Sequence, residues 1–153
     1  LVLRDQGKAV NIGVCNFPIG LTKEITEELR IPIFCNQVEF HPFLEQFDLL
    51  DYSYDQEFLI TAYSPLAQGK VFENDLLKEI GESHGKTAGQ VSLRWLIEQE
   101  NVVAIPKASS EKHLRENIDI FDFELTDEEF QSIDDLEKNM RLVNPSFAPD
   151  WSK

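Results

Sequence analysis

Four short apolar runs, separated by segments with helical patterning, most constrain what this chain can fold into. The runs are rich in β-branched and aromatic residues and are bounded by Pro, Gly or polar residues. They occupy residues 9–14, 33–38, 58–63 and 102–105. Continuous rather than alternating apolarity is typical of parallel strands covered on both faces. The pattern therefore predicts four parallel β-strands.

Helix signals fill the segments between these runs. Apolar residues recur at helical spacing over residues 21–29. Thr87 and Thr126 each begin a capping box, with Gln90 and Glu129 three residues later. A capping box marks the start of a helix because it satisfies backbone N–H groups that have no partner within the helix.

A strand followed by a helix, four times over, predicts a βα-repeat architecture. The longest gap, before the fourth run, holds two helical segments at residues 73–83 and 87–99, and an extra helix and an irregular tail (residues 140–153) follow the fourth unit. Four units fit either a small open sheet or half of an eight-unit barrel of about 250 residues. With no low-complexity linker, we expect residues 1–153 to be a single partial domain. The first residues resemble the end of a helix, so we expect a fragment.

Charge and cysteine content exclude several classes of function. The net charge of −14 argues against nucleic acids and anionic membranes, which bind basic faces. No run approaches the roughly 18 consecutive apolar residues of a membrane span. Cys15 and Cys35 lack the spacing of a zinc site or a disulfide scaffold, so we expect no metal and a cytoplasmic location.

Several catalytic motifs are absent from the sequence. Residues 85–87 (GKT) resemble the end of a phosphate-binding P-loop, but Ile80 stands where that motif needs Gly, and the segment follows a helix. No GxGxxG, GxSxG or HExxH motif occurs. His41 follows a strand alone, and we interpret it as structural.

Polar residues follow or interrupt each predicted strand. They are Cys15 and Asn16, Asn36 and Gln37, residues 63–69, and residues 106–110. Because the carboxyl ends of parallel strands meet at one edge, these groups are expected to converge there. Asn16 and Gln37 offer amides suited to a nicotinamide carboxamide, and Tyr63 offers a face for stacking on a planar ring. Lys107 and Ser109, before a helix, suit an anion.

The sequence resembles the aldo-keto reductase superfamily at these residues. The matching stretches are residues 12–17 (IGVCNF), 36–42 (NQVEFHP), 62–66 (AYSPL) and 105–117. Residues 139–145 and 148–151 further resemble the B-type branch of bacterial 2,5-diketo-D-gluconate reductases. The resemblance implies an α/β fold, in which the chain forms the second half, the last four βα units, of a (β/α)8 TIM barrel, plus a C-terminal helix and tail.

The resemblance also implies NADP(H) as cofactor and suggests which residues contact it. In the list that follows, the three residues before Tyr63 would hold the carboxamide, and Tyr63 would stack on the nicotinamide. The three residues after Tyr63 would line the pyrophosphate, and the remaining five would surround the adenosine 2′-phosphate and the adenine. The positions are Cys15, Asn16, Gln37, Tyr63, Ser64, Leu66, Gln68, Lys107, Ser109, His113, Glu116 and Asn117.

Departures from the family pattern concern cofactor choice. Cys15 and Ala108 stand where the family usually has Ser, and His113 stands where an Arg commonly pairs with the 2′-phosphate. A neutral imidazole is a poorer phosphate partner than a guanidinium, so the preference for NADPH is weakened. The family's catalytic Asp, Tyr, Lys and His have no match here, and no catalytic residue is assigned.

We therefore expect this chain to be part of an NADPH-dependent reductase of aldehydes or ketones. The expected substrates are dicarbonyls or keto sugars such as 2,5-diketo-D-gluconate. Phe147 and Trp151 are candidate substrate-side residues, with plain packing as the alternative. The isolated chain is expected to be inactive and to dimerise through open sheet edges, and the whole protein to be a monomer. Two other functions stay open: a non-catalytic subunit that senses the nicotinamide cofactor, and a barrel lyase or isomerase that binds phosphosugars.

Overall fold

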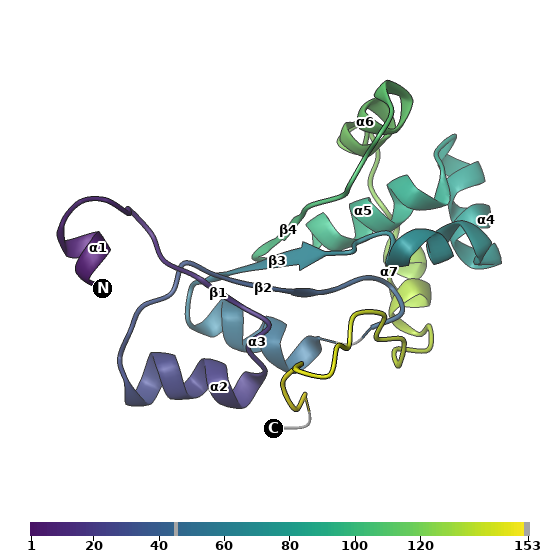
Figure 1. The fold of residues 1–153 in the computed structure, drawn as a ribbon. Coiled ribbons are helices and arrows are strands. Elements are labelled where there is room, and N and C mark those ends of the chain that lie inside the picture. The colour runs from purple at the N-terminus through teal and green to yellow at the C-terminus, as the bar shows by residue number, and fades with distance from the viewer. Residues whose placement is uncertain (45, 152–153) are drawn as a thin grey trace.

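One four-stranded parallel sheet organises the molecule, and its strands lie side by side in chain order (Figure 1). A computed structural model describes residues 1–44 and 46–151. The strands are β1 (Val14–Cys15), β2 (Cys35–Glu39), β3 (Leu59–Tyr63) and β4 (Val102–Ala104). Cys15 lies opposite Gln37, Glu39 opposite Tyr63, and Ala62 opposite Ala104. The predicted parallel sheet is confirmed.

Helical segments connect the strands. They are α1 (Val2–Asp5), α2 (Ile19–Lys23), the π-helical η1 (Glu24–Glu28), α3 (Phe47–Asp55), the 3₁₀ segment η2 (Ala67–Glu73), α4 (Asp75–His84), α5 (Ala88–Glu98), α6 (Glu111–Ile118) and α7 (Asp127–Asp134). Both predicted capping boxes form, Thr87 with Gln90 and Thr126 with Glu129. None of the helices in the described part of the chain is long and apolar enough to cross a membrane.

The first strand is shorter than the apolar run predicts. The prediction of a strand over residues 9–14 is wrong for most of that run, because only Val14 and Cys15 join the ladder, with one further bond from Phe34 N–H to the carbonyl of Ile12 (2.7 Å). Among the described residues no strand pairs with the outer edge of β1, so residues 9–13 lack a second row of hydrogen bonds. These residues are therefore not part of the ladder.

The core lies on the helix-covered face of the sheet. Val38, Ile60 and Ala62 are completely buried there, and Trp95 of α5 belongs to the same apolar cluster. Side chains alternate along a strand, so the intervening residues of β2 and β3 project from the opposite face. Gln37 and Tyr63 are only partly buried on that open face. The alternation thus separates the packing residues from the candidate site.

Candidate functional site

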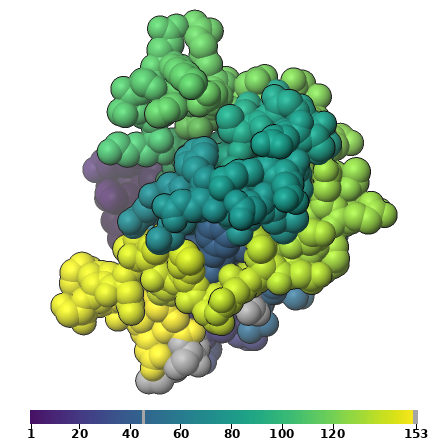
Figure 2. Space-filling view, turned by 90° about the vertical axis from the view of Figure 1, so that its right-hand side faces the viewer, coloured from purple at the N-terminus to yellow at the C-terminus, as the bar shows by residue number. Residues whose placement is uncertain are grey.

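The carboxyl ends of the four strands meet at one edge of the sheet. Figure 2 faces this edge, with α6 projecting at the top, the tail after residue 139 at the lower left, and η2 and α4 between them. Asn16 follows β1, Tyr63 ends β3, and Lys107 lies shortly after β4. The expected convergence of polar groups on one rim is therefore what the backbone geometry produces.

Asn16 is held between β2 and β3. Its backbone adopts a positive φ of 55°, and its N–H donates to the carbonyl of Gln37 (2.8 Å). Its side-chain amide interacts with the Tyr63 hydroxyl. The Oδ1 atom of Asn16 is buried and has no hydrogen-bond partner among the described residues. An unpaired buried acceptor is costly unless a ligand donates to it.

The two amides of β2 have different roles. Asn36 is fully buried on the helix side, where its Nδ2 donates to the carbonyl of Phe17 (2.8 Å) and to the hydroxyl of Thr22 (3.3 Å). It thereby fastens the loop after β1 to β2. Gln37, one residue later, projects from the open face beside Cys15. Only the second of these amides can serve a ligand.

Tyr63 and Cys15 are uncharged groups at this rim. Burial raises the pKa of Tyr63, and the nearby carboxylate of Glu39 raises it further. Cys15 is exposed, yet partial desolvation of its thiol raises the thiol's pKa, with a smaller contribution from Cys35. This part of the candidate site therefore presents neutral hydrogen-bonding groups and a phenol ring at ordinary pH.

The loop after β3 has an unusual backbone. Ser64, Ala67 and Gln68 have positive φ values of 51°, 47° and 53°, and Gly69 has 98°. Left-handed conformations are costly for residues other than Gly and persist where surrounding contacts impose them. The loop is held by Ser92, whose hydroxyl donates to the carbonyl of Pro65 (2.8 Å). Gln68 is exposed and Ser64 partly buried.

A cavity of about 190 Å³ lies farther along the rim, between the loop after β3, the start of α5, and α6. It is lined by Leu66, Phe72, Thr87, Gly89, Gln90, Lys107, His113, Glu116 and Asn117. Five of the twelve predicted cofactor residues therefore share one pocket. A Cβ at residue 89 would lie 2.8 Å from Phe72 Cζ, so glycine keeps this wall open. Ser109 is exposed outside the lining.

The basic patch at α6 is smaller than the sequence indicates. Arg115 pairs with Glu111 (2.6 Å) and Lys112 with Glu116 (3.6 Å), both one helical turn away. Lys107 has no carboxylate partner in the part of the chain that the structure describes. Lys107 and His113 are therefore the cationic or ionisable groups left to meet an anion.

The two candidate substrate-side residues differ in their surroundings. Phe147 is 86% exposed in this chain. Trp151 is partly buried against the core cluster, and the guanidinium of Arg141 stacks on its ring, 3.7 Å from Cζ to the ring centre. The substrate role proposed for both residues stays a prediction.

Two buried residues, Glu39 and His41, lie at the edge of the candidate site. The sequence analysis did not single out Glu39, whereas it interpreted His41 as structural. Glu39 is fully buried at the end of β2, and a carboxylate inside an apolar run was the available signal. His41 is also fully buried; its Nε2 lies 3.1 Å from Glu39 Oε1, and its Nδ1 accepts from Phe43 N–H (3.3 Å). The structural interpretation of His41 is confirmed. No group of metal-ligating side chains occurs among residues 1–44 and 46–151.

Comparison with known proteins gives consistent matches. The family described as "Aldo/keto reductase family" matches residues 2–138. The glyoxal reductase of Bacillus subtilis (strain 168) is 44% identical over 140 residues, which cover 92% of this chain and 50% of that protein. The chain spans about half the length of the curated relatives that it matches.

Solved structures agree with the sequence match. A structure assigned as a 2,5-diketo-D-gluconic acid reductase B has a TM-score of 0.93 at 43% identity, over 98% of this chain and 54% of that one. An aldo-keto reductase complexed with NADPH has a TM-score of 0.86 at 32% identity, over 94% and 47% of the two chains. The expected part of a TIM barrel is thus confirmed as the fold. On both sequence and structure, this chain belongs to the aldo/keto reductase family.

Proposed function

We propose that the whole protein is an NADPH-dependent reductase that converts aldehydes or ketones to alcohols, and that this chain forms its cofactor-binding half. The observation that carries the proposal is the buried Oδ1 of Asn16, which has no hydrogen-bond partner among the described residues and lies at the strand-end rim with Gln37 and Tyr63. A carboxamide N–H of nicotinamide is the donor that this acceptor lacks.

The residues present fit a nicotinamide cofactor along the whole rim. Asn16, Cys15 and Gln37 would fix the carboxamide, and the phenol ring of Tyr63 would stack on the nicotinamide. When bound, the cofactor supplies hydride to the carbonyl carbon of the substrate. Fixing the ring orientation decides which ring face meets the substrate, so these neutral groups would act by positioning.

The far end of the rim fits an adenosine phosphate. Ser64, Leu66 and Gln68 would follow the pyrophosphate along the loop after β3. Lys107 would meet the 2′-phosphate with an ammonium group that has no carboxylate partner among the described residues, and Ser109 and His113 would add hydrogen bonds. Glu116 and Asn117 line the same cavity and would face the adenine.

Proton transfer to the carbonyl oxygen needs groups that we do not assign within residues 1–153. We expect the family's catalytic Asp, Tyr, Lys and His to lie outside residues 1–153, and Tyr63 would stack on the ring. We therefore expect this chain alone to be inactive in carbonyl reduction. Phe147 and Trp151 would border the substrate from the tail.

The relatives and the free thiols support a proposal for the substrate and the location of the whole protein. A relative named glyoxal reductase and a structure assigned as a 2,5-diketo-D-gluconic acid reductase B support small dicarbonyls or keto sugars, including 2,5-diketo-D-gluconate, as substrates. The free thiols of Cys15 and Cys35 support a reducing compartment such as the cytoplasm. We expect the whole protein to work as a monomer.

The test measures binding and turnover separately. NADPH binding is followed by fluorescence titration, and carbonyl reduction by loss of NADPH absorbance with glyoxal and 2,5-diketo-D-gluconate. We expect the whole protein to show both, and Asn16→Ala to weaken NADPH binding. Binding without turnover would favour the cofactor-sensing alternative, which the reductase names of the relatives do not favour. Absence of NADPH binding would overturn the proposal.

A further inference from the structure

Glu39 places a carboxyl group in a fully buried position at the end of β2, where it lies opposite Tyr63 in the ladder. Burying a carboxylate without hydrogen-bond partners would cost much free energy, so the partners of Glu39 indicate its role. Oε1 accepts from His41 Nε2 (3.1 Å) and from the N–H of Leu142 (2.7 Å). Oε2 accepts from the N–H of Val143 (3.0 Å).

His41 supplies the fixed part of this arrangement. Its Nδ1 accepts from Phe43 N–H, which assigns the ring proton to Nε2, the atom that donates to Glu39. Burial by itself raises the pKa of Glu39, but the hydrogen bonds from His41, Leu142 and Val143 outweigh that effect and leave the pKa below its ordinary value. The carboxyl group is therefore charged at neutral pH.

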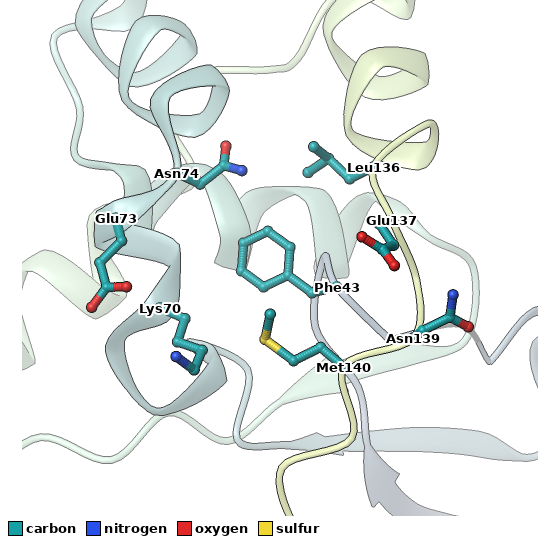
Figure 3. A pocket seen from close by; sticks show the side chains of 8 residues that line it. All are labelled: Phe43, Lys70, Glu73, Asn74, Leu136, Glu137, Asn139 and Met140. Carbon is teal, nitrogen blue, oxygen red and sulfur yellow. The ribbon is translucent and has the colours of Figure 1, made fainter.

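The remaining partners of Glu39 come from more than 100 residues away in the sequence. They belong to the tail segment, residues 138–143, which crosses the end of β2. The first residues of this segment contact the loop after β2. Lys138 Nζ donates to the carbonyl of Pro42 (2.8 Å), and Met140 N–H donates to the carbonyl of Phe43 (2.9 Å). Figure 3 shows Met140 beside the ring of Phe43. Residues 39–43 thus hold the tail at two successive points.

Arg141 extends this attachment toward the substrate side. Its Nη1 lies 3.9 Å from Glu39 Oε2, and its guanidinium stacks on the ring of Trp151. Tyr63 is close enough for Glu39 and Arg141 both to influence its pKa, in opposite directions. One buried carboxylate therefore connects the proposed nicotinamide-stacking ring to the tail that carries Trp151.

We propose that Glu39 is a positioning residue, whose carboxylate fastens the tail segment through the backbone N–H groups of Leu142 and Val143 and so sets where Trp151 stands relative to Tyr63. That the tail borders the substrate rests on the proposed function, whereas the attachment itself does not. The competing explanation is that apolar contacts of the tail dock it without help from Glu39.

The test uses the whole protein labelled with 5-fluorotryptophan, with the Trp151 signal assigned from Trp151→Phe. In Glu39→Gln, a neutral amide must face N–H donors, so we expect the ¹⁹F signal of Trp151 to move toward its position in unfolded protein while that of buried Trp95 stays. We expect KM for the carbonyl substrate to rise about tenfold and the Kd for NADPH to change by less than about twofold. The matched control is Glu137→Gln, the same change at an exposed carboxyl nearby, which should alter none of these readouts.

A second variant leaves β2 intact. Val143→Pro removes the N–H that binds Oε2, and we expect the same movement of the Trp151 signal and the same rise in KM. If the Trp95 signal also moves in Glu39→Gln, Val143→Pro decides the question. An unchanged Trp151 signal, or a released Trp151 with unchanged KM, overturns the proposal. Loss of NADPH binding in the unaltered protein would overturn the proposed function instead, while the ¹⁹F signals still decide whether Glu39 holds the tail.

Discussion

The two ends of the proposed cofactor site are built in different ways. At the nicotinamide end, Asn16, Gln37 and Tyr63 lie on or next to strands and are partly buried, and Asn16 interacts with both of the others. At the adenosine end, Lys107 and His113 are exposed, and α6 contains no buried residue. The first end is neutral and fixed by packing, whereas the cationic groups of the second lie exposed on α6 and on the segment before it. We therefore expect the first to set geometry and the second to set cofactor preference.

The largest expected effect tests the packed end. Tyr63→Ala removes the proposed stacking surface and should weaken the binding of NADPH and NADH alike by about 30-fold, or about 2 kcal/mol. Tyr54→Ala, at an exposed tyrosine of α3, is the control and should leave both affinities unchanged. Fluorescence titration measures both. Equal affinities in Tyr63→Ala and the unaltered protein would contradict a stacking role.

The next effect tests the charged end. Lys107→Met should weaken NADPH binding about tenfold and leave NADH binding within about twofold, because only NADPH carries the 2′-phosphate. The control is Lys112→Met, at an ammonium group that already pairs with Glu116. If the affinities for NADPH and NADH fall equally, Lys107 stabilises the site without recognising the 2′-phosphate.

A smaller gain is expected at residue 113. His113→Arg introduces a guanidinium that is always charged and can bind phosphate with two hydrogen bonds. We expect NADPH binding to strengthen about fivefold and NADH binding to stay the same, as judged by the ratio of the two Kd values. A gain for both cofactors would point to general attraction of anions rather than to recognition of the 2′-phosphate.

The smallest effect is an expected lack of response. The pKa of Tyr63 and the pKa of Cys15 are both raised by burial, so both groups keep their protons until the pH exceeds their ordinary values. NADH binding should therefore vary by less than about twofold between about pH 6 and about pH 8.5. A marked fall within this window would show that a titrating group takes part at the nicotinamide end.

Local sequence patterns predicted most of the scaffold. The four apolar runs gave the strands, and the capping boxes at Thr87 and Thr126 gave two helix starts, because both signals depend on nearby residues. The run at residues 9–14 overstated β1, since a ladder depends on a partner strand that no local pattern reveals. The polar residues at strand ends likewise predicted a common rim, because parallel strands share one direction.

Contacts between distant segments could not be predicted in the same way. Nothing in the order of residues shows that the tail returns to Glu39. The pairs Glu111–Arg115 and Lys112–Glu116, in contrast, have the four-residue spacing of ion pairs on a helix, so the sequence could have revealed them. The assignment of functional roles to Asn16, Gln37 and Lys107 came from their type and from their places within or after strands. The fold brings these residues to one rim, and their roles in binding stay predictions.

The opposite facing of Asn36 and Gln37 limits how this protein can be redesigned. The amide of Asn36 holds the loop after β1, and the amide of Gln37 projects from the open face. A shift of a strand by one residue moves every side chain to the opposite face of the sheet. Inserting a single residue ahead of β2 would turn Asn36 to the open face and Gln37 to the helix side. The loop after β1 would then lose the amide that holds it, and the open face would lose the amide of Gln37. Insertions of two residues would restore the order, so graftable versions of this strand should differ in length by even numbers only.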